Sequence, residues 1–309
     1  MTPPSWQLGA LTCQRISIPS LAASAIDGTA QTSIPAPLGG KVSCPIPDED
    51  MRQQIGTVLQ LLAATQMLRY PCLTFEGLFR VIVAPDRHAA VMANASLLEA
   101  IGQPVAEHLS NKSAFAFPCD QGVVVILPLE IVRYAMAPDS EPERQYGLTT
   151  IWHEFAHVKA ITMQYFCEGK MQRPFPAPVA KWVNQAWHEF FADRHSHWPG
   201  FSTVLEQKLV IDAWLLLQRD GSPSSANHLL VRLASAYGRH TASGSNQDAF
   251  IRLFPTIFNT FAVISMWEAC AQALEQACAF VHQHDKSPNL IRLEHSMERL
   301  SVQLTTAWL

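Results

Sequence analysis

Apolar and polar residues alternate along this chain with two different periods, and the periods predict its helices and strands. Residues 48–70 open with three acidic residues, which favour a helix N-terminus, and they are followed by Pro71. Apolar residues recur in this segment at helical spacing, at Ile55, Leu59, Leu62 and Met67. We therefore expect a helix here that buries one face.

The next segments have the pattern of short strands. Residues 78–83, with the sequence Leu-Phe-Arg-Val-Ile-Val, predict a strand, and residues 89–101 predict a helix that Gly102 ends. Residues 114–117 and 123–127 predict two strands of a hairpin. The second of them has two interpretations: an extended substrate adds to its edge, or it is an ordinary strand buried on both faces.

The remainder of the chain has the pattern of helices, near residues 202–219, 225–237, 246–284 with a break at Pro255, and 288–307. The predicted fold class is α+β, with a small early sheet and a mostly helical C-terminal half. Residues 1–47 are rich in Pro, Ser, Thr, Ala and Gly and predict a flexible tail. One domain is expected over residues 48–309, with an α/β part (48–168) and a helical part (169–309). The loop at 169–178, with three prolines, is expected to form part of a cleft wall.

Composition excludes several classes of protein. The chain has 309 residues and a net charge of −4, so it has no basic field to hold nucleic acid. Its seven cysteines include no Cys-x-x-Cys pair, which favours a reducing compartment. The N-terminus lacks a signal-peptide pattern, and we expect a cytoplasmic protein or one exported without a cleaved signal peptide. Residues 261–281 are apolar-rich but contain Glu268 and Glu275, which predicts a core helix and no membrane span.

Residues 153–157 have the sequence His-Glu-Phe-Ala-His within a stretch of helical pattern. His153 and His157 are four residues apart and lie on one helix face, where both imidazoles can bind one metal ion. Glu154 is rotated aside, where its carboxylate can take a proton from a metal-activated water. Apolar neighbours such as Trp152 and Phe155 predict that the helix is buried, and buried ionisable groups need partners. The spacing is a zinc-hydrolase signature.

A catalytic zinc usually has three protein ligands and one open position, so a third donor is needed. The best candidate is Glu189, in a second helical segment with the sequence Trp-His-Glu-Phe-Phe-Ala-Asp-Arg over residues 187–194. Asp193 follows one turn later on the same face, where its carboxylate can accept a hydrogen bond from a ligand histidine. One helix would then supply both a ligand and the group that orients another ligand.

With these two segments the chain resembles the gluzincin group of zinc metallopeptidases, whose motif is His-Glu-x-x-His on one helix and Glu-x-x-x-Asp on a later one. The second segment is also similar to the Glu-x-x-Ala-Asp pattern of integral-membrane endopeptidases, although their spanning helices are missing here. The resemblance covers about residues 148–194. It implies a zincin-like fold with one zinc ion per chain, held by His153, His157 and Glu189. It also implies that Glu154 is the general base and that Asp193 orients a ligand.

The activity implied by the resemblance is that of a metalloendopeptidase acting on protein or peptide substrates. Zinc would lower the pKa of its water from about 15.7 toward about 7, and Glu154 would accept the proton and pass it to the leaving amine. The developing oxyanion needs a further donor, commonly a Tyr or His in this group. The first candidates are Tyr237 and His240, followed by His195 and His197.

Two other functions fit the same residues. A non-catalytic binding or regulatory protein would keep a zinc-stabilised helical core without cutting peptides. A secreted bacterial effector protease would share the chemistry and use residues 1–47 as an uncleaved leader.

One departure from the gluzincin pattern is Lys159, two places after the second histidine, where an apolar residue is usual; we expect its ammonium to reach solvent along its apolar stem.

Overall fold

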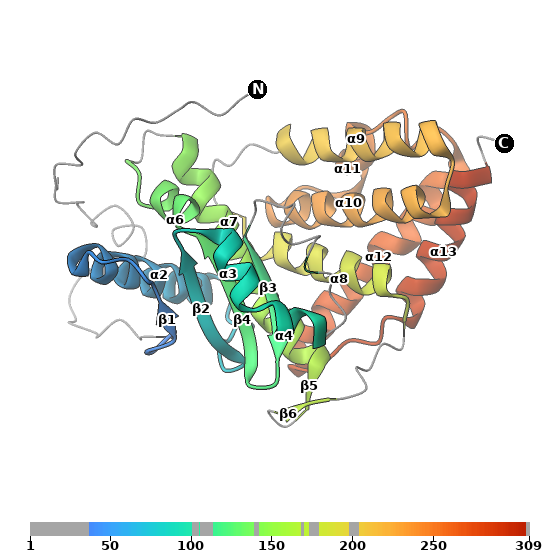
Figure 1. Ribbon diagram of the computed structural model, residues 1–309. Helices are drawn as coiled ribbons and strands as arrows, with labels where there is room; N and C mark the ends of the chain where they lie inside the picture. The colour runs from blue at the N-terminus through green and yellow to red at the C-terminus, as the bar shows by residue number, and fades with distance from the viewer. Residues whose placement is uncertain are drawn as a thin grey trace, which may run out of the picture. The chain divides into compact units, whose positions relative to one another are not determined.

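The computed structural model describes residues 37–100, 105, 114–138, 142–167, 170–172, 179–197 and 204–306. All of them belong to one unit of the chain, Pro35–Leu309. A small mixed sheet lies in the first half and the second half is helical, so the predicted α+β class is confirmed for the described residues (Figure 1).

The first long helix, α2, extends over Glu49–Arg69, as the apolar spacing predicts. Its N-cap is Asp48, whose carboxylate accepts a hydrogen bond from the Met51 N–H at 3.0 Å. Tyr70 is the C-cap, because the following proline does not continue a helix. The face that carries Ile55 and Leu59 is buried in the core.

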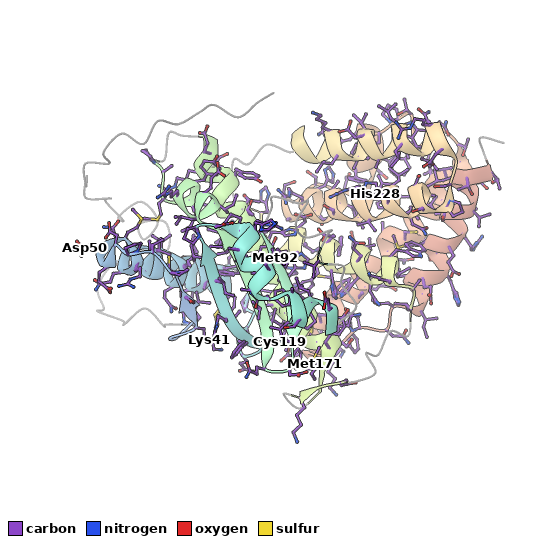
Figure 2. The ribbon with its side chains drawn as sticks, viewed as in Figure 1. Lys41, Asp50, Met92, Cys119, Met171 and His228 are labelled. Atoms are coloured by element: carbon purple, nitrogen blue, oxygen red, sulfur yellow. The ribbon has the colours of Figure 1, made fainter. Side chains whose placement is uncertain are left out.

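Four strands form the main sheet in the order β1-β2-β4-β3. They are β1 (Val42–Ser43), β2 (Leu78–Ala84), β3 (Phe115–Cys119) and β4 (Gly122–Pro128). β1, β2 and β4 are parallel, whereas β3 pairs antiparallel with β4 as the predicted hairpin. Cys119, labelled in Figure 2, lies where β3 ends and the turn into β4 begins.

Both faces of the sheet are covered, which explains the unbroken apolar sequence of β4. The covering helices are α3 (Arg87–Ala93), α4 (Ala95–Ala100), α6 (Leu129–Ala135) and α7 (Pro142–Tyr165). Val124 and Ile126 pack in one core cluster with α3 and α4, while Val123 and Val125 belong to another with α2, α6 and α7. β4 is hydrogen-bonded on both edges, so the idea that a substrate adds to it is wrong and the buried-strand interpretation is confirmed.

The folded part extends N-terminally beyond its predicted start at residue 48. Leu38 is fully buried, and its N–H donates to Gln60 Oε1 at 2.9 Å. β1 pairs with β2, so residues 37–47 belong to the domain rather than to a flexible tail. Residues 1–36, the remainder of that predicted tail, lie outside the described residues.

The second half consists of packed helices. They are α8 (Lys181–Arg194), α9 (Val204–Asp220), α10 (Pro223–Ala242), α11 (Gln247–Leu253), α12 (Phe261–His284) and α13 (Ile291–Thr306). The expected break at Pro255 separates α11 from α12. A two-stranded hairpin of β5 (Phe166–Cys167) and β6 (Lys170–Met171) precedes residues 173–178, and most of the predicted cleft wall lies outside the described residues.

α8 and α10 approach closely at one glycine. A β-carbon at Gly238 would lie 2.3 Å from the backbone oxygen of Phe190, a distance that no larger side chain allows. This close approach places Ser235 and Arg239, on the same helix, within hydrogen-bonding distance of Asp193 on α8. The packing of these two helices therefore positions part of the candidate site.

The apolar-rich stretch at residues 261–281 is a core helix, as predicted. It forms most of α12, which buries Trp267, Cys270 and Leu274 in the helical half. Within the described parts of the chain, no helix combines the length and apolar character needed to cross a bilayer.

Candidate metal centre

α7 carries the His-Glu-x-x-His motif through the interior of the domain. Ile151, Trp152 and Phe155 are almost fully buried, and the Trp152 Nε1–H donates to the Leu62 backbone oxygen of α2 at 2.9 Å. Gln66 of α2 also donates to the Trp152 backbone oxygen, at 2.7 Å. These contacts fix the rotation of α7 and hence the direction in which its two histidines point.

The two histidine rings and a carboxylate from α8 converge. His153 Nε2 lies 2.9 Å from His157 Nε2. The carboxylate oxygens of Glu189 lie 3.5 Å from His153 Nε2 and 3.8 Å from His157 Nε2. One ligand atom from each residue lies within 4.8 Å of the other two, the spacing of a candidate metal site.

This spacing agrees with a zinc ion at the centre. Zinc binds nitrogen and oxygen at about 2.0–2.2 Å, which places tetrahedral neighbours about 3.3–3.6 Å apart. The distance of 3.5 Å from Glu189 to His153 lies in this range, and that of 3.8 Å to His157 is slightly longer. The histidine rings would separate by roughly half an ångström to reach it. The structure thus brings together His153, His157 and Glu189, the three ligands that the sequence predicts.

Asp193 holds His153 in place from the opposite side of the ring. Its Oδ1 lies 3.0 Å from His153 Nδ1 and also accepts from Arg239, while Ser235 donates to Oδ2. Because Asp193 accepts the Nδ1 proton, Nε2 is the His153 nitrogen directed at the shared position, and it offers a lone pair there once a metal ion replaces its proton. Asp193 therefore lies where the sequence places the orienting residue.

The charges of the two histidines differ. Burial by itself would lower the pKa of His153, but the carboxylates of Asp193 and Glu189 outweigh it and raise that pKa well above its usual value. Burial and the neighbouring His153 charge lower the pKa of His157 to about 3. His153 is therefore an imidazolium in this arrangement and His157 is neutral.

The pKa values of the carboxyl groups are also shifted in opposite directions. Burial would raise the pKa of Glu189, but the hydrogen bond and charge of His153 lower it to about 2. Arg239 and His153 likewise lower the pKa of Asp193 against its burial. Glu154 is only 6% exposed, and burial raises its pKa to about 7 despite the nearby His153 charge.

These charges indicate what kind of ligand fits. The cations of His153 and Arg239 balance the carboxylates of Glu189 and Asp193, which leaves Glu154 without a counter-charge. A divalent cation in place of the His153 proton adds the one positive charge that an ionised Glu154 requires. Two imidazoles, a carboxylate and this balance fit a zinc-type dication.

The predicted oxyanion stabilisers lie elsewhere. Tyr237 is fully buried against Phe190, Phe250 and Trp267, and its hydroxyl donates to Glu275. The ring of His240 lies near the C-terminus of α10, with Nε2 3.0 Å from the backbone oxygen of Asn246. The prediction that Tyr237 and His240 stabilise the oxyanion is therefore corrected. Tyr237 is a core residue, and His240 contacts the backbone of a loop.

The alternative stabilisers also have other contacts. His195 contacts Cys72 and His282 through Nε2. Burial lowers the pKa of His197, which lies just beyond α8. Neither belongs to the group formed by His153, His157 and Glu189.

Two other residues lie beside the histidines. The ring of His188, from α8, is 6.3 Å from that of His157 and 6.5 Å from that of Tyr165 at the end of α7. His188 Nε2 is buried without a hydrogen-bond partner, and burial lowers its pKa to about 4. Their positions in the sequence, next to the two motifs, were the only signal for them, because neighbours on a helix often face away from one another.

Lys159 does not extend to solvent, so that expectation is wrong. It is 6% exposed, and its ammonium donates to Asp285 at the C-terminal end of α12. A hollow between α9 and α10 is lined by residues that include Asp212, Arg219 and His228, and it contains none of the candidate ligands. Figure 2 labels His228 on α10. The candidate metal-binding group is thus recognised by its donors rather than by a large cavity.

Comparisons of the chain with protein-family models, with curated proteins and with solved structures find no match. The candidate metal centre rests on its own geometry, in which two imidazoles and a carboxylate from α7 and α8 surround a common position.

Proposed function

We propose that this chain is a zinc-dependent endopeptidase that hydrolyses peptide bonds of protein substrates. The observation that supports it best is the convergence of His153, His157 and Glu189 beside the buried carboxyl of Glu154. Catalytic zinc sites use such imidazole and carboxylate donors and leave one position open. A zincin-like arrangement of α7 beside the sheet belongs to the same proposal.

His153, His157 and Glu189 would hold the ion, and when bound it would supply Lewis acidity toward a peptide carbonyl and toward water. Asp193 keeps His153 in the tautomer that presents Nε2 to this position. Ser235 and Arg239 fix Asp193 in turn, so that ligand geometry is set before substrate arrives.

Glu154 is the general base of the proposed reaction. Its pKa of about 7 lies near neutral pH, where a carboxylate both accepts a proton and returns it efficiently. It would take the proton of the attacking water and pass it to the leaving amine. The nearby His153 and the two carboxylates tune this pKa, since each acts on the Glu154 charge.

His188 and Tyr165 take the place of Tyr237 and His240 as stabilisers of the oxyanion. His188 has an unpaired buried Nε2 close to the His157 ring, and the Tyr165 ring adjoins it. A donor of this kind contributes about 3–4 kcal/mol to the transition state. His188 is the first of the two to test because its neutral ring has an N–H to donate.

An extended substrate has a suitable partner in β3. Among the described strands, β3 lies at an edge of the sheet, hydrogen-bonded only to β4, and α7 packs against both. Main-chain pairing with such an edge gives affinity without dependence on sequence. Pro118 has no N–H, so the pairing would involve the residues before it.

The test compares the wild-type chain with Glu154→Gln after zinc loading, using a broad peptide library and metal analysis. The proposal predicts equal zinc content and a loss of cleavage of at least about a hundredfold in the variant. Glu268→Gln, an exposed glutamate on α12, is the matched control and should cut like the wild type.

Two results would overturn the proposal. Cleavage by Glu154→Gln at the wild-type rate would remove Glu154 from the chemistry. Zinc binding without any cleavage by the wild type across the library would favour the alternative of a non-catalytic, zinc-stabilised binding protein.

A further inference from the structure

A second group of side chains that could hold a metal ion lies at the C-terminal end of α8. Cys72 Sγ lies 3.7 Å from His195 Nε2, which is 2.9 Å from His282 Nε2. Cys278 Sγ lies 3.6 Å from the same His282 nitrogen. The ligand atoms of Cys72, His195 and His282 all lie within 4.8 Å of one another, and Cys278 adjoins this group through His282. None of them takes part in the proposed hydrolysis.

Three of the distances between these donors are close to the edges of a zinc tetrahedron. With bonds of about 2.3 Å to sulfur and 2.0–2.1 Å to nitrogen, a sulfur and a nitrogen ligand are about 3.6 Å apart and two nitrogens about 3.3 Å. Both sulfur–nitrogen distances agree with this value. The two rings, at 2.9 Å, would separate by roughly half an ångström.

The buried histidine is already oriented for ligation. Nδ1 of His195 lies 2.6 Å from the Phe191 backbone oxygen and donates its proton there, which leaves Nε2 with a lone pair toward the cysteines. The ring is held between Tyr70, at 5.1 Å, and Phe191, at 4.2 Å. Gln66 donates to the His195 backbone oxygen at 2.8 Å. Such outer contacts are typical of structural metal sites.

Burial keeps both thiols protonated until a bound metal ion displaces their protons. Lys159 and Arg194 lower the pKa of Cys72 and Cys278 respectively, although burial is the larger effect and raises the pKa of these thiols to about 11 and about 12. Two thiolates and two neutral imidazoles neutralise a divalent ion, and no further charge has to be buried. Lys159 is itself paired with Asp285, the residue that follows α12.

We propose that Cys72, His195 and His282 hold a second, structural zinc ion, with the neighbouring Cys278 as the fourth ligand of a Cys2His2 site. Four protein ligands leave no position for substrate, so this ion stabilises the fold rather than catalysing a reaction. It connects the turn after α2 with the C-terminal ends of α8 and α12. Because α8 also carries Glu189 and Asp193, the site fixes the helix on which the candidate metal centre depends.

Cobalt spectroscopy of the full chain tests this inference. Cobalt bound by thiolates gives intense ligand-to-metal charge-transfer absorption, whereas cobalt bound by His153, His157 and Glu189 has no sulfur ligand and gives none. The wild-type chain, kept reduced, should bind about two ions and show the thiolate bands. Zinc-edge absorption should show sulfur neighbours at about 2.3 Å.

Substitutions assign the bands to these residues. His282→Gln changes an exposed ring, so folding is preserved, and it should weaken binding of one ion at least tenfold and shift the charge-transfer bands. Cys72→Ser should also reduce their intensity. The matched controls are His284→Gln and Cys44→Ser, which should leave binding and bands unchanged.

The proposal fails if reduced wild-type chain binds cobalt without thiolate bands, or if His282→Gln leaves the bands as they are. It also fails if peptide mapping of purified protein finds Cys72 and Cys278 joined as a disulfide that excludes metal. His153→Gln separates this inference from the proposed function: the thiolate bands should persist in that variant even though the candidate metal centre is disrupted.

Discussion

Replacing Asp193 by asparagine tests how the candidate metal centre is held. The carboxylate of Asp193 is 2% exposed and is the counter-charge of Arg239, which is 8% exposed. It also accepts from His153 Nδ1 at 3.0 Å. Asp193→Asn keeps the shape of the side chain but removes its charge, so a buried guanidinium loses its ionic partner and a ligand histidine loses the group that orients it.

The magnitudes follow from these two losses. Breaking a buried ion pair by neutralising one partner costs about 3–5 kcal/mol of unfolding free energy. Loss of a group that orients a ligand histidine weakens metal binding about 10–100-fold. A second change, Arg239→Met, removes the uncompensated charge, so the double variant should recover much of its stability but none of its metal affinity.

Urea unfolding in the presence of a chelator measures stability, and zinc competition with a chromophoric chelator measures affinity. Asp212→Asn, an exposed aspartate on α9, is the control and should change stability by less than about 0.5 kcal/mol. The reasoning is refuted if Asp193→Asn binds zinc as tightly as the wild type, or if Arg239→Met restores affinity together with stability.

Three further predictions concern packing and charge. Gly238→Ala should cost at least about 1–3 kcal/mol in urea unfolding, because its methyl group would lie 2.3 Å from the Phe190 backbone oxygen; wild-type stability would contradict this packing. Asp285→Ala should destabilise more than Lys159→Met, since only the first leaves a buried ammonium unpaired, and the reverse order in thermal melts would be inconsistent with the pair. His188 has a folded pKa of about 4, below its usual 6.5, so the unfolded chain binds more protons and stability is lost as pH falls from about 6.5 toward 4. With chelator present, the melting temperature of His188→Gln should change less with pH across that window than that of the wild type. An equal change in both proteins would rule out this contribution.

Local pattern predicted much of the fold because its causes are local. The acidic start and apolar spacing of residues 48–70 correspond to the N-cap Asp48 and the buried face of α2. The hairpin of β3 and β4 follows from two apolar runs joined by a short turn. The early start of the domain at Leu38 was missed, since β1 is only two residues long and its pairing with β2 depends on tertiary contact.

The candidate site was likewise predicted where its causes are local and missed where they depend on tertiary packing. Helical spacing alone places His153 and His157 on one face, and the second motif indicated Glu189 and Asp193. The position of Tyr237 could not be predicted, because it depends on how α10 packs against α12.

The second group of possible metal ligands could be predicted from the sequence only in part. Cys278 and His282 have the i, i+4 spacing of two ligands on one helix, a signal that sequence can supply. Their partners Cys72 and His195 come from distant segments, and only the folded chain shows them together.

The most direct measurement of the central claim is the anomalous diffraction of zinc-loaded crystals at the zinc absorption edge. The account predicts an ion bonded at about 2.0–2.2 Å to His153 Nε2, His157 Nε2 and a Glu189 oxygen, with Asp193 hydrogen-bonded to the far side of His153. An anomalous map of fully loaded protein without a peak between these three side chains would contradict it.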